Sequence, residues 1–120
     1  MLKRIGATLG AATVAGLIAV APAAAAPQAI SVTASVSGQV CQGGDFAKVT
    51  LQATAQSEAQ PVVFRWDFTN NGSFDTPATT RDTVNHGYPD EVNVTARVIA
   101  VNSAGERATD TVSFATLRCP

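Results

Sequence analysis

The polar segment that follows the only tryptophan has the spacing of a calcium-binding loop. Oxygen-bearing side chains occupy its first, third, fifth and ninth positions and glycine its sixth: Asp67, Thr69, Asn71, Asp75 and Gly72. Calcium takes about six to eight oxygen ligands, and Ala78 replaces the usual Glu at the last position. The sequence therefore predicts at most weak calcium binding, with Asp67, Asn71 and Asp75 as ligands. The alternative, which the composition favours, is a polar turn in which Asp67 accepts hydrogen bonds from amides of its own loop.

The same carboxylates, or the single histidine, are the only groups that suggest catalysis. Paired carboxylates held about 5–9 Å apart hydrolyse glycosides, and Asp67 and Asp75 share one loop. A Ser-His-Asp arrangement would need a nucleophile and an acid beside His86, and the sequence places neither there. We therefore expect no enzyme activity. The alternative is a small secreted hydrolase, or an inhibitor of one, that uses the loop carboxylates.

Residues 1–26 have the layout of a secretory signal peptide. Lys3 and Arg4 precede an uncharged stretch of small and apolar residues, and an Ala-rich segment follows it. The alternative, a membrane anchor, is disfavoured because the uncharged stretch is shorter than the roughly 20 residues that span a bilayer. We expect a secreted, extracellular protein that does not remain on the membrane, with residues 27–120 as its one domain.

The charge of this domain limits its partners. Loss of Lys3 and Arg4 lowers the formal net charge from −1 to −3, and the remaining cations are scattered along the sequence. Nucleic-acid binding is therefore excluded on electrostatic grounds. We expect a monomer whose partner is an extracellular protein or polysaccharide.

The only two cysteines are Cys41 and Cys119. Two cysteines alone do not complete a zinc site, and no Cys-x-x-Cys redox motif is present. In an exported protein the expected state is a disulfide. The sequence therefore predicts a bond between Cys41 and Cys119, which closes a long loop.

Alternating apolar and polar residues predict strands along the whole domain. The expected strands cover residues 30–36, 47–55, 64–68, 84–88, 92–101 and 106–117, with 92–101 the longest. We expect Ser37-Gly38 to end the first strand, residues 41–45 to form a turn, Pro61 to open the tryptophan strand and residues 102–105 to form a hairpin turn. Six or seven short strands predict an all-β, two-sheet sandwich.

The strand period also predicts which side chains form the core. The tryptophan strand turns Phe64, Trp66 and Phe68 inward and Arg65 and Asp67 outward. In the neighbouring strands the expected inward residues are Ala47, Val49, Leu51, Ala53, Val92, Val94, Ala96, Val98, Ala100, Val112 and Phe114. A sheet buries Trp66 only when a second layer covers it, which again predicts a sandwich.

Three motifs in order resemble the PKD (polycystic kidney disease) domain family: Trp66-Asp67-Phe68, His86-Gly87-Tyr88, and residues 92–101 leading into Asn102-Ser103-Ala104-Gly105. The resemblance covers residues 30–117 and implies an immunoglobulin-like sandwich. It also implies that His86 is a structural core residue and that the hydroxyl of Tyr88 is tied to backbone. The sequence departs from the family at residues 69–72, where Gly-Asp-Gly is frequent, and at residues 89–92, where a Pro-Gly turn is usual.

Such domains act as extracellular spacers, adhesion units or accessory modules. The resemblance and the lack of catalytic groups predict a non-catalytic module for adhesion, protein or polysaccharide binding, or structural spacing. We expect residues 70–82, called the binding loop below, to carry recognition because they are polar and little constrained by packing. Its candidate contact residues are Asn70, Asn71, Ser73, Asp75, Arg81 and Asp82.

Overall fold

The computed structural model describes residues 29–120, which form six β-strands and no helix. The predicted signal peptide lies outside the described residues. Within residues 29–120, no helix is long and apolar enough to cross a membrane.

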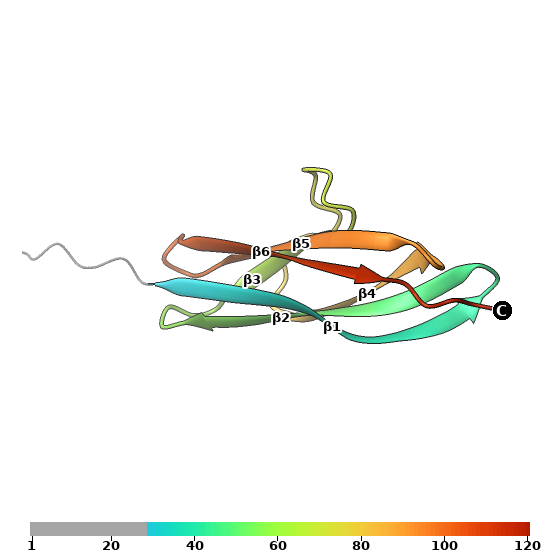
Figure 1. Cartoon of the computed structure of the whole chain (residues 1–120). Helices are drawn as coiled ribbons and strands as arrows, with labels where there is room; N and C mark the ends of the chain where they lie inside the picture. The colour runs from blue at the N-terminus through green and yellow to red at the C-terminus, as the bar shows by residue number, and fades with distance from the viewer. Residues whose placement is uncertain (1–28) are drawn as a thin grey trace, which may run out of the picture.

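The strands form two antiparallel sheets of three strands each. Their bounds are β1 Ile30–Gly43, β2 Phe46–Ser57, β3 Val63–Asp67, β4 Thr83–Pro89, β5 Asn93–Val101 and β6 Arg107–Ala115. One sheet has the order β1-β2-β4 and the other β3-β5-β6. The two sheets pack face to face, with β5 and β6 in one layer and β1 and β2 in the other (Figure 1). The predicted all-β, two-layer architecture is confirmed.

The core lies between the sheets and consists of the alternate residues that the strand period selects. Trp66, Leu51, Val49 and Val98 are among its largest fully buried side chains. The prediction that Ala47, Val49, Leu51, Ala53, Ala96, Val98 and Ala100 turn inward is confirmed. Val94, Val112 and Phe114 are partly buried and pack against this core.

The first strand is longer than predicted. β1 has 14 residues and continues past Ser37-Gly38 to Gly43, so β1, not the strand at residues 92–101, is the longest. The pairing with β2 shifts by one residue between Val36 and Gly38, which is a β-bulge. A bulge accommodates a residue that interrupts the alternation without ending the strand. Cys41 therefore lies in a strand and not in a turn.

Two further predictions need correction at strand ends, and Asp67 has an unexpected burial. Pro61 follows a cis peptide bond and precedes β3, which begins at Val63. Val92 precedes β5 and is 36% exposed, so it is not an inward residue. Asp67, expected to point outward, is fully buried. Asp67 keeps the outer face of β3, opposite Arg97, and is buried because the binding loop covers it there.

The edges of the two sheets are joined on one side. The amide of Ala34 in β1 donates to the Asp110 carboxylate of β6 over 2.8 Å. Further along, the side-chain amide of Gln39 donates to the carbonyl of Ala115 and accepts from the amide of Leu117. These side-chain bonds connect β1 to β6 where no backbone ladder exists.

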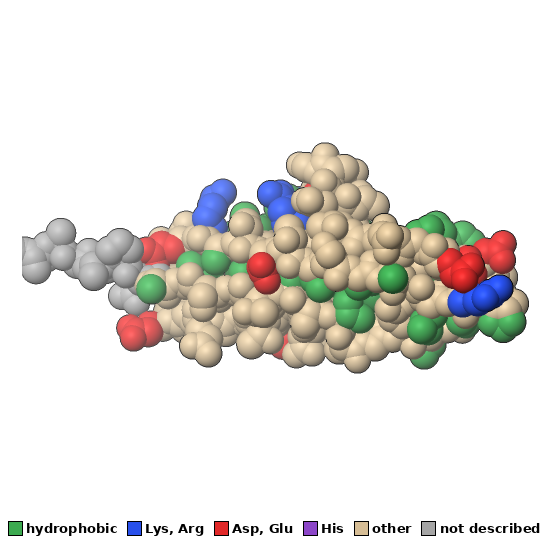
Figure 2. All heavy atoms as spheres, viewed as in Figure 1, with side chains coloured by type: hydrophobic (Ala, Val, Ile, Leu, Met, Phe, Trp, Pro, Cys, Tyr) green, Lys and Arg blue, Asp and Glu red, His purple; other side chains and the backbone are tan. Residues whose placement is uncertain are grey.

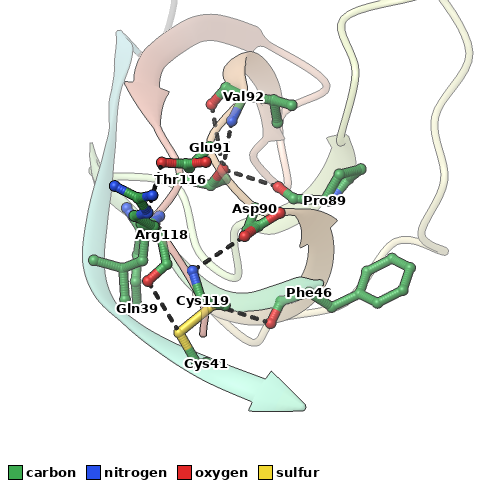
Figure 3. Close-up of a disulfide and its surroundings, with 11 residues drawn as sticks. Gln39, Cys41, Phe46, Pro89, Asp90, Glu91, Val92, Thr116, Arg118 and Cys119 are labelled. Atoms are coloured by element: carbon green, nitrogen blue, oxygen red, sulfur yellow. Dashed lines mark hydrogen bonds and ion pairs between the residues drawn. A yellow bond between two sulfur atoms is a disulfide. The ribbon is translucent and has the colours of Figure 1, made fainter. Parts of the chain in front are cut away.

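The predicted bond between Cys41 and Cys119 is present (Figure 3). The two Cα atoms lie 5.5 Å apart, and the residues are separated by 78 positions in the sequence. The amide of Cys119 also donates to the Asp90 carboxylate over 3.1 Å. The C-terminal segment is thereby fixed to β1 and to the connection between β4 and β5.

Candidate functional site

The binding loop leaves the sandwich directly after β3 and stands out from the body of the molecule (Figures 1 and 2). Its tip, residues 70–73, is exposed and entirely polar or glycine. Asn70 and Gly72 adopt positive φ angles of 54° and 93°, which Asn and Gly tolerate best. The tip is therefore a tight turn that its sequence suits.

Asp67 holds the base of this turn. Its carboxylate accepts hydrogen bonds from the backbone amides of Thr69, Asn71 and Gly72 over 3.4, 3.1 and 2.9 Å. Burying a carboxylate is costly unless it is hydrogen-bonded, and three amide donors meet that need here. Asp67 lies on the outer face that strand alternation predicts, but it is buried there because these amides cover its carboxylate.

Asp75 closes the turn from the other side. Its carboxylate accepts from the amide of Phe68 over 2.8 Å, and its own amide donates to the carbonyl of Trp66 over 2.7 Å. Further along the loop, Phe64 and Thr79 exchange two backbone hydrogen bonds. The second half of the binding loop thus covers the outer edge of β3.

The carboxylates of Asp67 and Asp75 therefore accept hydrogen bonds from backbone amides, as the polar-turn alternative predicts. Asn71, the third candidate calcium ligand, accepts from the amide of Ser73 over 2.9 Å. Within residues 29–120, no group of three or more His, Cys, Asp and Glu side chains is placed to hold a metal ion. Weak calcium binding at this loop stays a prediction.

An aromatic cluster supports the loop from β4. The hydroxyl of Tyr88 donates to the carbonyl of Phe68 over 2.7 Å, so the expected tie to backbone is present. His86 stacks on Phe68 with ring centroids 4.0 Å apart, and meets Tyr88 edge-on at 4.7 Å. Phe64, Trp66, Phe68 and Tyr88 are buried, whereas His86 is only partly buried.

The two titratable members of the cluster have shifted pKa values. Burial raises the pKa of Tyr88 to about 12, with smaller contributions from the negative charges of Asp75 and Asp67. Burial lowers the pKa of His86, and Asp75 opposes that shift. His86 is therefore neutral at pH 7 and stacks as an uncharged ring.

The candidate contact residues divide into two groups, apart from Asp75, which closes the base of the turn. Asn70, Asn71 and Ser73 belong to the exposed tip, whereas Arg81 and Asp82 lie beside β2, where the Asp82 carbonyl accepts from the amide of Ala53. A pocket of about 350 Å³ lies between the second half of the loop and β4. Its lining includes Trp66, Thr76, Thr79, Arg81, Thr83, Val84 and Asn85.

Phe74 makes contacts that no pattern in the sequence predicts. Its ring lies 5.1 Å from the guanidinium carbon of Arg65 and 4.9 Å from that of Arg97. Strand alternation placed Arg65 outward, but no sequence signal indicates that the loop folds back over the sheet. The binding loop is thus joined to the outer face of the β3-β5-β6 sheet.

No family model, curated protein or solved structure matches this chain.

Proposed function

We propose that this chain is an exported, non-catalytic β-sandwich module, of the immunoglobulin-like PKD type, that binds an extracellular protein or polysaccharide. Its support is the ordered set of PKD-like motifs, the two-sheet architecture and the disulfide. The alternative of a hydrolase has no comparable support, because Asp67 is fully buried and bound to amides of its own loop.

The observation that carries this proposal is the fixed, exposed tip of the binding loop. Hydrogen bonds to Asp67, Asp75 and Tyr88 hold its base, while residues 70–73 point away from the body. Binding is stronger when the surface is already in its bound shape, because less conformational entropy is lost on association. A rigid polar loop on a disulfide-closed sandwich meets that requirement.

The pocket between the second half of the binding loop and β4 provides a second polar surface for a partner. Threonine hydroxyls, the Asn85 amide and the Arg81 guanidinium surround it. Trp66 is one of the residues that line the pocket, and its buried indole N–H has no hydrogen-bond partner within residues 29–120. Hydroxyl, amide and guanidinium groups suit the hydroxyl-rich surface of a saccharide.

The proposal is tested by replacing the tip and not the whole loop, because the second half pairs with β3. The variant is Asn70→Gly, Asn71→Gly, Ser73→Gly; its control is Thr33→Ala, Ser35→Ala, which alters exposed side chains on β1. The exported protein, immobilised, captures partners from culture supernatant and envelope fractions. We expect wild type and control to retain the partner and the tip variant to lose it, with all three equally folded. If the tip variant captures the partner as well as wild type does, the binding site lies on a strand face or a sheet edge and not at the tip.

A further inference from the structure

The outer face of the β3-β5-β6 sheet carries one arginine on each strand. Arg97 lies in the central strand β5, Arg65 in β3 opposite Ile99, and Arg107 in β6 opposite Val101. Arg65 and Arg107 are thus displaced from Arg97 by two and four residues along the sheet, which corresponds to about 7 and 13 Å. We call these three residues the arginine face.

Two of the three arginines have no acid opposite them, because Arg65 pairs with Ile99 and Arg107 with Val101. The acid opposite Arg97 is Asp67, whose carboxylate is buried and turned toward amides of the binding loop. Within residues 29–120 the one ion pair joins Arg118 and Glu91, at the other end of the sandwich. Three of the six Lys and Arg residues in that range lie on this face of a net-negative protein.

Two of the arginines are held close together. The guanidinium carbons of Arg65 and Arg97 both lie about 5 Å from the Phe74 ring, so they are separated by no more than the sum of those two distances. Arg65 Nε donates to the Thr76 carbonyl over 3.2 Å, while Arg97 Nε is buried without a partner. Neither guanidinium makes another hydrogen bond within residues 29–120, so their terminal N–H groups remain for a ligand.

We propose that the arginine face binds a linear polysaccharide that carries carboxylate groups. Charges spread over about 13 Å suit a chain with repeated anionic groups better than a single small anion, and the planar guanidinium matches a carboxylate with two parallel hydrogen bonds. Exposed hydroxyls on β6 lie beside the arginines and suit sugar hydroxyls: Thr111 is opposite Arg97, and Thr109 lies between Thr111 and Arg107. Basic side chains gather along the same edge as the projecting loop in Figure 2.

Other polyanions fit this face less well. Single-stranded nucleic acids are bound through exposed aromatic rings on which bases stack, and Phe74 is partly buried beside two guanidinium groups. Protein partners are usually anchored by large apolar or aromatic side chains. The exposed large hydrophobic residues are Val40, Phe46, Val92 and Leu117, none of which lies on the arginine face.

The test measures binding to polygalacturonate, a linear polycarboxylate, with neutral dextran as the uncharged comparison. The variant Arg65→Gln, Arg107→Gln removes two exposed charges and leaves the partly buried Arg97 in place. The control Lys48→Gln, Arg118→Gln removes the same charge elsewhere. We expect the variant to raise the Kd for polygalacturonate by about tenfold, the typical effect of two exposed charge contacts. The control should bind as wild type does, added salt should weaken binding, and dextran should not bind.

Three results would overturn the inference: no wild-type binding to polygalacturonate at low salt, equal affinity of variant and control, or equally arginine-dependent binding of oligothymidylate or polyglutamate. Melting curves establish that all variants are folded. The inference rests on the proposal that the chain is a binding module, but uses a surface separate from the loop tip. A tip variant that loses the captured partner but still binds polygalacturonate would support both proposals, and a tip variant that keeps both activities would contradict the role of the tip alone.

Discussion

The hydroxyl of Tyr88 donates a 2.7 Å hydrogen bond to the backbone carbonyl of Phe68, and so joins β4 to the point where β3 turns into the binding loop. The bond is buried and spans two sheets, because β4 belongs to one and β3 to the other. It connects the position of the loop to the packing of the sandwich.

Because the Tyr88 hydroxyl is buried in this bond, the free energy of unfolding should fall at alkaline pH. The pKa of Tyr88 is raised from 10.0 to about 12 in the folded protein, first by burial and then by Asp75 and Asp67. Because the folded value is the higher one, the stabilisation is complete below pH 10 and is lost as pH rises to about 12. Thermal unfolding between these pH values should show the loss, and Tyr88→Phe should remove that part of the pH dependence. Phenolate absorbance of this single tyrosine reports its ionisation directly; a midpoint near 10 would contradict the raised pKa.

Asp67→Ala should lower the free energy of unfolding by about 3 kcal/mol, because it leaves buried backbone amides of the loop without their acceptor. Asp67→Asn keeps one side-chain oxygen and should cost less. Chemical denaturation of both variants provides the measurement. Equal, small effects of the two substitutions would show that solvent replaces the carboxylate without cost.

Removal of the disulfide by Cys41→Ser, Cys119→Ser should lower stability by up to roughly 4.5 kcal/mol, from the chain entropy of a loop this long. Urea denaturation of the variant and of wild type gives the difference. Thiol labelling without reductant should find no free cysteine in the secreted protein, and full labelling of both would refute the bond.

Trp66→Ala should destabilise the fold by about 3–5 kcal/mol, the range for buried aromatic residues, because Trp66 is only 2% exposed. Trp66→Phe is the matched variant. It keeps an aromatic ring and removes an N–H that has no partner within residues 29–120, so its cost should be smaller. A greater loss in the Phe variant than in the Ala variant would contradict this account of the site.

Millimolar calcium should change the melting temperature little, because amides already occupy the oxygens of Asp67 and Asp75. Melting curves with calcium and with chelator are compared for wild type and for Asp75→Asn. A rise of many degrees in wild type alone would show that the loop rearranges to bind the ion.

The sequence predicted those parts of the fold in which one physical rule acts alone. Strand alternation selects Val49 and Leu51 for the core, and the turn signal at residues 102–105 predicts the β5–β6 hairpin, in which Gly105 has a positive φ. Two cysteines leave one pairing within the chain, and the structure contains it.

Where two rules competed, the sequence was ambiguous. Ser37-Gly38 is as compatible with a bulge as with a strand end, and only pairing with β2 decides between them. Asp67 follows the alternation of β3 but also begins a turn, and its amide partners exist only after the loop has formed. The contact of Phe74 with Arg65 and Arg97 depends on the path of that loop, so no local pattern predicts it.

The position of the disulfide has a mechanical consequence. A pulling force that enters at Ile30 and leaves at Pro120 passes from Cys41 directly to Cys119, so the chain between them carries no load. Only the segment before Cys41 is free to peel away from β2 and β6, and its release adds little length because the segment is already an extended strand in the fold. With the disulfide formed, the chain therefore lengthens only slightly under tension. Once the disulfide is reduced, the chain unfolds along its whole sequence.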